Sequence, residues 1–195
     1  MKQNRKWTVL QISTIGVFAA LVFLMNFIQI PVALSVGNTR IHLGNVMCLL
    51  SGFVLGPVGG GLAAGIGSGL YDLMMGDFIY IPFYFVFKFL LAFCGALAAN
   101  IFRRGVKPIA AYALGGFCGQ ICYIVLHLAC KTFFFNMILY KMAEEAILLD
   151  LAKATVISAI NGALAVVIST ILALALAPVY EKMRDQSAKS AEPEE

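Results

Sequence analysis

The stretch that decides the fold is GFVLGPVGGGLAAGIGSGLYDLMMG, residues 52–76. It carries no charge before Asp72, and the pair Gly56-Pro57 predicts a tight reversal between two helices. Three pairs of glycines have the four-residue spacing that lets helix backbones approach closely in lipid. They are Gly56/Gly60, Gly61/Gly65 and Gly65/Gly69. The stretch lacks the Lys-Ser/Thr ending of a nucleotide-binding loop, so we interpret its glycines as packing positions in a membrane bundle.

The composition extends this interpretation to the whole chain. Of its 195 residues, 61% are hydrophobic and 12% are charged, which is typical of an integral membrane protein. A spanning helix needs about 20 residues, so we predict an all-α bundle of six transmembrane helices, with no room for a separate soluble domain. The expected spans lie near residues 8–32, 43–56, 58–75, 80–102, 109–132 and 152–178.

The remaining segments are expected to be connections and a tail. The bundle domain is predicted to cover residues 1–180, and the polar segment 181–195 is predicted to be a disordered cytoplasmic tail. The connection 31–42 contains proline and glycine and is expected to form a loop that covers the bundle like a lid. A second long connection is expected over residues 133–151.

The distribution of basic residues predicts the orientation. With an even number of spans both termini share one side, and that side is cytoplasmic where lysine and arginine are in excess. The other side carries Arg40, Lys131, Lys141 and Lys153. The predicted cytoplasmic side carries Lys2, Arg5, Lys6, Arg103, Arg104, Lys107, Lys182, Arg184 and Lys189.

The polar residues inside the spans indicate a pocket at the outer end of the bundle. Side chains three or four positions apart share one face of a helix, and a polar face is costly in lipid. The stripes are Gln120/Tyr123/His127/Lys131, Gly61/Gly65/Ser68/Asp72, Tyr84/Lys88 and Asp150/Asn161. Tyr80, Phe83 and Phe87 add aromatic walls. We therefore expect one cavity with polar anchors and aromatic sides.

Several of these residues have a purely structural interpretation as well. Lys88 and Lys131 can extend toward the membrane surface. Asp72 can neutralise Lys88 without any ligand, His127 can hydrogen-bond between helices, and Tyr123 can belong to the aromatic belt at the interface. On the first span, Gly16, Ala19 and Ala20 form a patch of small residues in the cytoplasmic half, suited either to docking another membrane protein or to packing within the chain.

Three segments resemble the substrate-binding S components of energy-coupling factor (ECF) vitamin transporters. They are RIHLGN (40–45), the stretch 52–76 and FKFLLAFCGALAA (87–99), and the resemblance covers residues 8 to about 180. It implies a six-helix bundle that binds a vitamin or vitamin precursor from outside, with a membrane coupling subunit and cytoplasmic ATPase subunits as partners. It also implies that Gly16, Ala19 and Ala20 dock the coupling subunit.

The expected binding residues combine this resemblance with the polar stripes. They are Arg40, His42, Asn45, Asp72, Tyr84, Lys88, Tyr123, His127, Lys131 and Asn161. Aromatic walls suit a flat heterocycle, and an excess of cations from Arg40, Lys88 and Lys131 favours acceptor or anionic groups on the ligand. A pyridoxine-like, pyrimidine-precursor or flavin-like vitamin meets both conditions.

Other classes of function have less support. The chain lacks a nucleotide-binding motif, and no nucleophile, metal cluster or carboxylate pair with enzymatic spacing lies at membrane depth, so we expect no enzyme, cofactor or metal, and no nucleic-acid partner. The expected location is a bacterial-type plasma membrane, with several spans. The alternative is a solo proton- or ion-coupled carrier for a small metabolite, in which Asp72, Lys88 and His127 form a relay.

Overall fold

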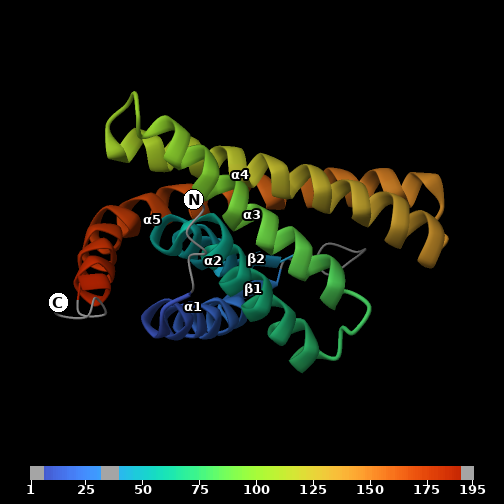
Figure 1. Ribbon diagram of the computed structural model, residues 1–195. Coiled ribbons are helices and arrows are strands. Elements are labelled where there is room, and N and C mark those ends of the chain that lie inside the picture. Colours follow the sequence, from blue (N-terminus) through green and yellow to red (C-terminus); the bar gives the residue numbers. More distant parts are fainter. Residues whose placement is uncertain (1–6, 32–39, 190–195) are drawn as a thin grey trace, which may run out of the picture.

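The computed structural model describes residues 7–31 and 40–189 and forms a helical bundle (Figure 1). Its elements are α1 (Val9–Phe27), β1 (Gln29–Pro31), β2 (Arg40–His42), α2 (Gly44–Met75), α3 (Ile81–Phe102), α4 (Pro108–Cys130), the π-helix η1 (Lys131–Leu139) and α5 (Glu144–Lys189). The prediction of an apolar helical bundle is confirmed. The short antiparallel pair β1–β2 was not predicted.

Helix α2 doubles back on itself at Gly56. This residue has φ 83° and ψ 176°, a conformation that glycine adopts at little steric cost. Ser51 Oγ donates a hydrogen bond to the carbonyl oxygen of Gly60 at 3.1 Å, and a Cβ added to Gly60 would lie 2.3 Å from the Cα of Gly52. Residues eight apart in a straight helix are about 12 Å apart along its axis, so the two arms of α2 must lie side by side.

The described residues contain five helices that are long and apolar enough to cross a membrane, where the sequence predicted six spans. The prediction of six is therefore not confirmed. The two numbers differ because α2 is one of the five helices, whereas the sequence predicted two spans, 43–56 and 58–75, on either side of the reversal at Gly56. Its first arm, residues 44–55, is about 18 Å long, shorter than the hydrocarbon layer of about 30 Å.

The bundle has two chemically different ends. At one end, which we call the basic end, the first α2 arm, the α3–α4 connection 103–107 and α5 near Glu181 come together. Arg103 there forms a salt bridge with Glu181 at 3.3 Å, and the ring of Tyr112 packs against Phe53 with centroids 5.0 Å apart. The opposite end, which we call the pocket end, carries β1–β2, the α2–α3 turn and η1.

The α4–α5 region is more helical than the sequence predicted. The expected connection 133–151 is replaced by η1, a short link over residues 140–143 and the first turns of α5. At its other end α5 continues past the expected boundary at 180 to Lys189, and its last part turns away from the rest of the helix (Figure 1). Residues 190–195 and residues 32–39 of the expected lid lie outside the described residues.

Glycines fix the distances between neighbouring helices. A Cβ on Gly119 of α4 would lie 2.6 Å from the carbonyl oxygen of Leu91 on α3, and one on Gly67 of α2 would lie 2.3 Å from that of Ala19 on α1. The helices touch backbone to backbone at these positions, as small residues allow in membranes. The close contact between α3 and α4 explains why Tyr84 and Lys88 on α3 face His127 on α4 at the pocket end.

The structure corrects one part of the expected docking patch. Ala19 is only 5% exposed because it packs against Gly67 within the same chain, so it is not available to a partner. Gly16 and Ala20 lie about 60° and about 100° from Ala19 around α1 and remain exposed. Docking through these two residues stays a prediction.

Candidate ligand-binding site

The pocket end contains a cavity of about 480 Å³, a volume suited to one small organic molecule. All five α-helices, β1–β2 and η1 contribute to its lining. Nine of the ten expected binding residues lie on its wall. They are His42, Asn45, Asp72, Tyr84, Lys88, Tyr123, His127, Lys131 and Asn161. The side chain of Arg40, the tenth, lies outside the described residues, and contact of any of the ten with a ligand stays a prediction.

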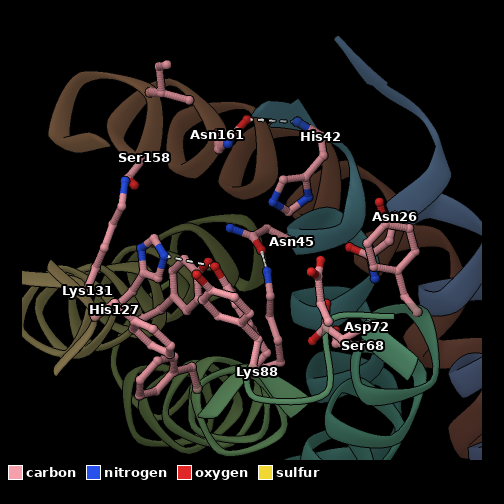
Figure 2. Close-up of a pocket in the computed structure, with 18 of the residues that line it drawn as sticks. Asn26, His42, Asn45, Ser68, Asp72, Lys88, His127, Lys131, Ser158 and Asn161 are labelled. Atoms are coloured by element: carbon pink, nitrogen blue, oxygen red, sulfur yellow. Dashed lines mark hydrogen bonds between the residues drawn. The ribbon is translucent and has the colours of Figure 1, made fainter. Parts of the chain in front are cut away.

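Lys88 is the central cation of the pocket. Its side chain is 2% exposed, and its Nζ donates a hydrogen bond to Asn45 Oδ1 and lies 4.5 Å from the centroid of the Tyr123 ring. Figure 2 shows Lys88 and Asp72 pointing into the same part of the cavity. The α2 reversal at Gly56 makes this possible, because it returns the arm that carries Asp72 to the level of Asn45. Lys88 therefore points inward, not toward the membrane surface.

Aromatic rings line the side of the cavity formed by α3 and α4. The rings of Tyr123 and His127 stack with centroids 5.4 Å apart and an angle of 3° between their planes. Tyr84 Oη and His127 Nε2 share a hydrogen bond of 3.2 Å. His127 Nδ1 is buried and has no hydrogen-bond partner among the described residues, so it is free to bond a ligand or a water molecule.

A hydrogen-bonded cluster around Asp150 forms another part of the cavity wall. Asp150 on α5 is 2% exposed, and it accepts hydrogen bonds from Lys131 Nζ at 3.0 Å and from Asn136 Nδ2 at 2.8 Å. The wider turn of the π-helix lets η1 place Phe135 and Asn136 together on the buried face. Lys131 therefore has a structural partner within the chain, which its sequence position did not indicate.

This pairing lowers the positive charge that the described part of the wall offers to a ligand. Of the three cations behind the expected excess, the side chain of Arg40 lies outside the described residues, and the described charged side chains on the wall are Lys88 and Lys131 against Asp72, Asp77 and Asp150. Lys131 is already neutralised by Asp150. The described wall therefore favours an uncharged ligand with both donor and acceptor groups over an anionic one.

Asn161 has a structural contact besides its place on the wall. Its Oδ1 accepts a hydrogen bond of 3.1 Å from the backbone N–H of His42, which ties β2 to α5 (Figure 2). His42 Nδ1 in turn accepts from the N–H of Gly44 at 3.2 Å, at the start of α2. Together these bonds hold the second strand over the pocket.

Other lining residues were missed by the sequence reasoning. Those that it did not consider at all are Tyr71, Asp77, Phe135, Asn136, Tyr140, Met142, Ile157 and Ser158. Ile157 and Ser158 lie one turn from Asn161 on α5, so the helical period could have found them. The residues between 131 and 142 could not be found this way, because that segment was expected to be a loop.

We expect Lys131→Met to lower the free energy of unfolding by about 1 to 3 kcal/mol. Removing one partner of a fully buried ion pair costs about 3–5 kcal/mol, and the 22% exposure of Lys131 reduces that cost. The double variant Lys131→Met/Asp150→Asn removes the orphaned charge and should recover part of the loss. Thermal unfolding in detergent measures both; a double variant that is less stable than the single one would contradict the account.

The fold and the cavity define a class of protein: a multi-pass membrane helical bundle that contains a cavity lined by polar and aromatic side chains. The model of the family "ECF-type riboflavin transporter, S component" matches residues 6–178. This match covers most of the 195 residues, and the chain belongs to that family of transporter subunits. The resemblance seen in the sequence is thereby confirmed. No curated protein matches the chain.

Proposed function

We propose that the chain is the substrate-binding subunit of an ECF transporter and that its ligand is riboflavin, bound in the cavity at the pocket end. The observation that carries this proposal is the combination of one buried cation, Lys88, with stacked aromatic side chains in a cavity of about 480 Å³. A flavin offers a flat ring for the aromatic side and hydroxyl groups for the cluster around Asp150.

The proposed orientation places the pocket end outside the cell. The positive-inside rule puts an end that is rich in lysine and arginine in the cytoplasm. The basic end carries Arg103, Arg104, Lys107, Lys182 and Arg184. In this arrangement the first α2 arm descends part of the way through a bacterial plasma membrane from the pocket end, the second arm returns, and both termini lie on the cytoplasmic side. A membrane coupling subunit and cytoplasmic ATPase subunits would then supply the energy for uptake.

The proposed division of labour is tested by uptake into vesicles. Riboflavin should accumulate when the chain is present together with its coupling and ATPase subunits and ATP is supplied. The chain alone should bind riboflavin without accumulating it. Accumulation by the chain alone, driven by a proton or ion gradient, would contradict the proposal and support a solo carrier.

The charges on the wall predict a preference between two forms of the ligand. Riboflavin should bind at least tenfold more tightly than flavin mononucleotide, its phosphate ester. A phosphate adds about −1.5 to −2 charges at neutral pH, and Asp72, Asp77 and Asp150 disfavour these charges in the cavity. Competition of the two flavins in a fluorescence titration measures the ratio, and equal or tighter binding of the ester would overturn the prediction.

A further inference from the structure

Two tyrosines meet where α3 begins and η1 ends. Tyr80 and Tyr140 both line the cavity, and their hydroxyl groups share a hydrogen bond of 2.8 Å. The ring of Tyr80 also stacks on Phe135 of η1, with centroids 4.3 Å apart and an angle of 15° between the planes. These contacts join α3 to the η1–α5 connection across the pocket end. These contacts involve other segments of the chain than the β1–β2 pair, which also lies at the pocket end.

The Tyr80 side of this contact is firmly held. Asp77 N–H donates to the carbonyl oxygen of Asp72 at 2.9 Å, and Tyr80 N–H donates to that of Asp77 at 2.9 Å. Gly76, the residue before Asp77, adopts φ 79° and caps the C-terminal end of α2. The turn that carries Tyr80 is therefore hydrogen-bonded at successive positions and continues directly into α3.

The Tyr140 side is strained. Lys141, the next residue, has φ 48°, and among the described residues it is the one non-glycine residue with a positive φ. Such a conformation costs free energy and persists only where the surrounding contacts impose it. Tyr140 itself is 54% exposed, and its side chain is held by the bond to Tyr80. Its backbone N–H donates to the carbonyl oxygen of Phe135 at 2.8 Å, and that of Met142 donates to the carbonyl oxygen of Asn136 at 2.9 Å, so movement of the link has to break these two bonds as well. Any movement of the contact is therefore expected in residues 140–143.

We propose that residues 140–143 form a gate to the cavity, which the hydrogen bond between Tyr80 and Tyr140 holds closed, and that opening of this gate limits how fast the ligand exchanges. The inference rests on the proposed function, because it takes the cavity to be the flavin site. Tyr80 keeps its hydroxyl proton at neutral pH and can form this bond. Burial is the main cause that raises the pKa of Tyr80 above its ordinary value, and the hydrogen bond to Tyr140 is the second.

Stopped-flow measurements of riboflavin binding test the gate. Tyr80→Phe and Tyr140→Phe should each raise the association and dissociation rates together by about three- to tenfold, the effect of one neutral hydrogen bond. Phenylalanine keeps both rings on the wall, so the dissociation constant should change less than either rate. The double variant should match each single variant, because all three lack the same bond. Tyr180→Phe, at the basic end, is the matched control and should exchange riboflavin at the wild-type rates.

Hydrogen exchange in the ligand-free protein gives a second readout. Backbone amides of residues 140–143 should exchange faster in both tyrosine variants than in the wild type or in Tyr180→Phe. Unchanged exchange and unchanged binding rates would overturn the gate, as would additive effects of the two substitutions. If the wild type fails to bind riboflavin while the amides respond as expected, the proposed function fails and the gate stands.

Discussion

Replacing Lys88 by methionine is expected to weaken riboflavin binding by about a hundredfold. Hydrogen bonds to a charged group contribute about 1.5–3 kcal/mol, and Lys88 is the cation of the wall whose Nζ reaches into the cavity beside Asn45 and Tyr123. Methionine keeps the apolar stem that packs between the helices, so the bundle should still fold. Titration of purified protein with riboflavin, followed by flavin fluorescence, measures the loss.

Two results would contradict this prediction. Lys107→Met, on an exposed residue at the basic end, is the control and should leave the affinity unchanged. Equal affinities of the Lys88 variant and the control would remove Lys88 from the site. Intact binding combined with lost pH dependence of uptake would instead support the alternative, in which Asp72, Lys88 and His127 carry protons.

The largest loss of stability is expected from Gly60→Val. A Cβ at this position would lie 2.3 Å from Gly52 Cα and 2.5 Å from the carbonyl oxygen of Ser51, so backbone atoms of the first α2 arm would have to move. Overpacking costs about 1–3 kcal/mol where side chains can adjust, and here they cannot, so we expect about 3 kcal/mol or more. The thermal unfolding midpoint in detergent measures the effect.

A second glycine on the same arm provides the matched control. A Cβ on Gly69 would meet its nearest atom, Ile81 Cγ2, at 3.7 Å, an ordinary contact distance. Gly69→Ala should therefore change the free energy of unfolding by less than about 0.5 kcal/mol. If Gly60→Val were as mild as Gly69→Ala, the close approach of the two α2 arms would be wrong.

The helical period and the depth of each residue explain how the sequence could predict most of the pocket. Tyr84 and Lys88 share one face of α3, and Tyr123 and His127 share one face of α4, so bundling alone brings them together. The reversal at Gly56 could be predicted because a glycine followed by proline breaks a helix. These features depend on local sequence and on the cost of polar groups in lipid.

The features that were missed depend on contacts between distant residues. Nothing in the local pattern indicates that Lys131 pairs with Asp150, and that pair changes the expected charge of the pocket. The π-helical register of η1 differs from the regular helical period, so the period could not place Asn136 on the wall. The burial of Ala19 was also missed, because its packing against Gly67 depends on how α1 is rotated toward α2.

The most direct test of the account is equilibrium binding of riboflavin to the purified chain without any other subunit. The account predicts one riboflavin per chain, and binding that is about a hundredfold weaker in the Lys88→Met variant. Absence of riboflavin binding by the folded wild-type chain, or equally tight binding by the variant, would contradict it.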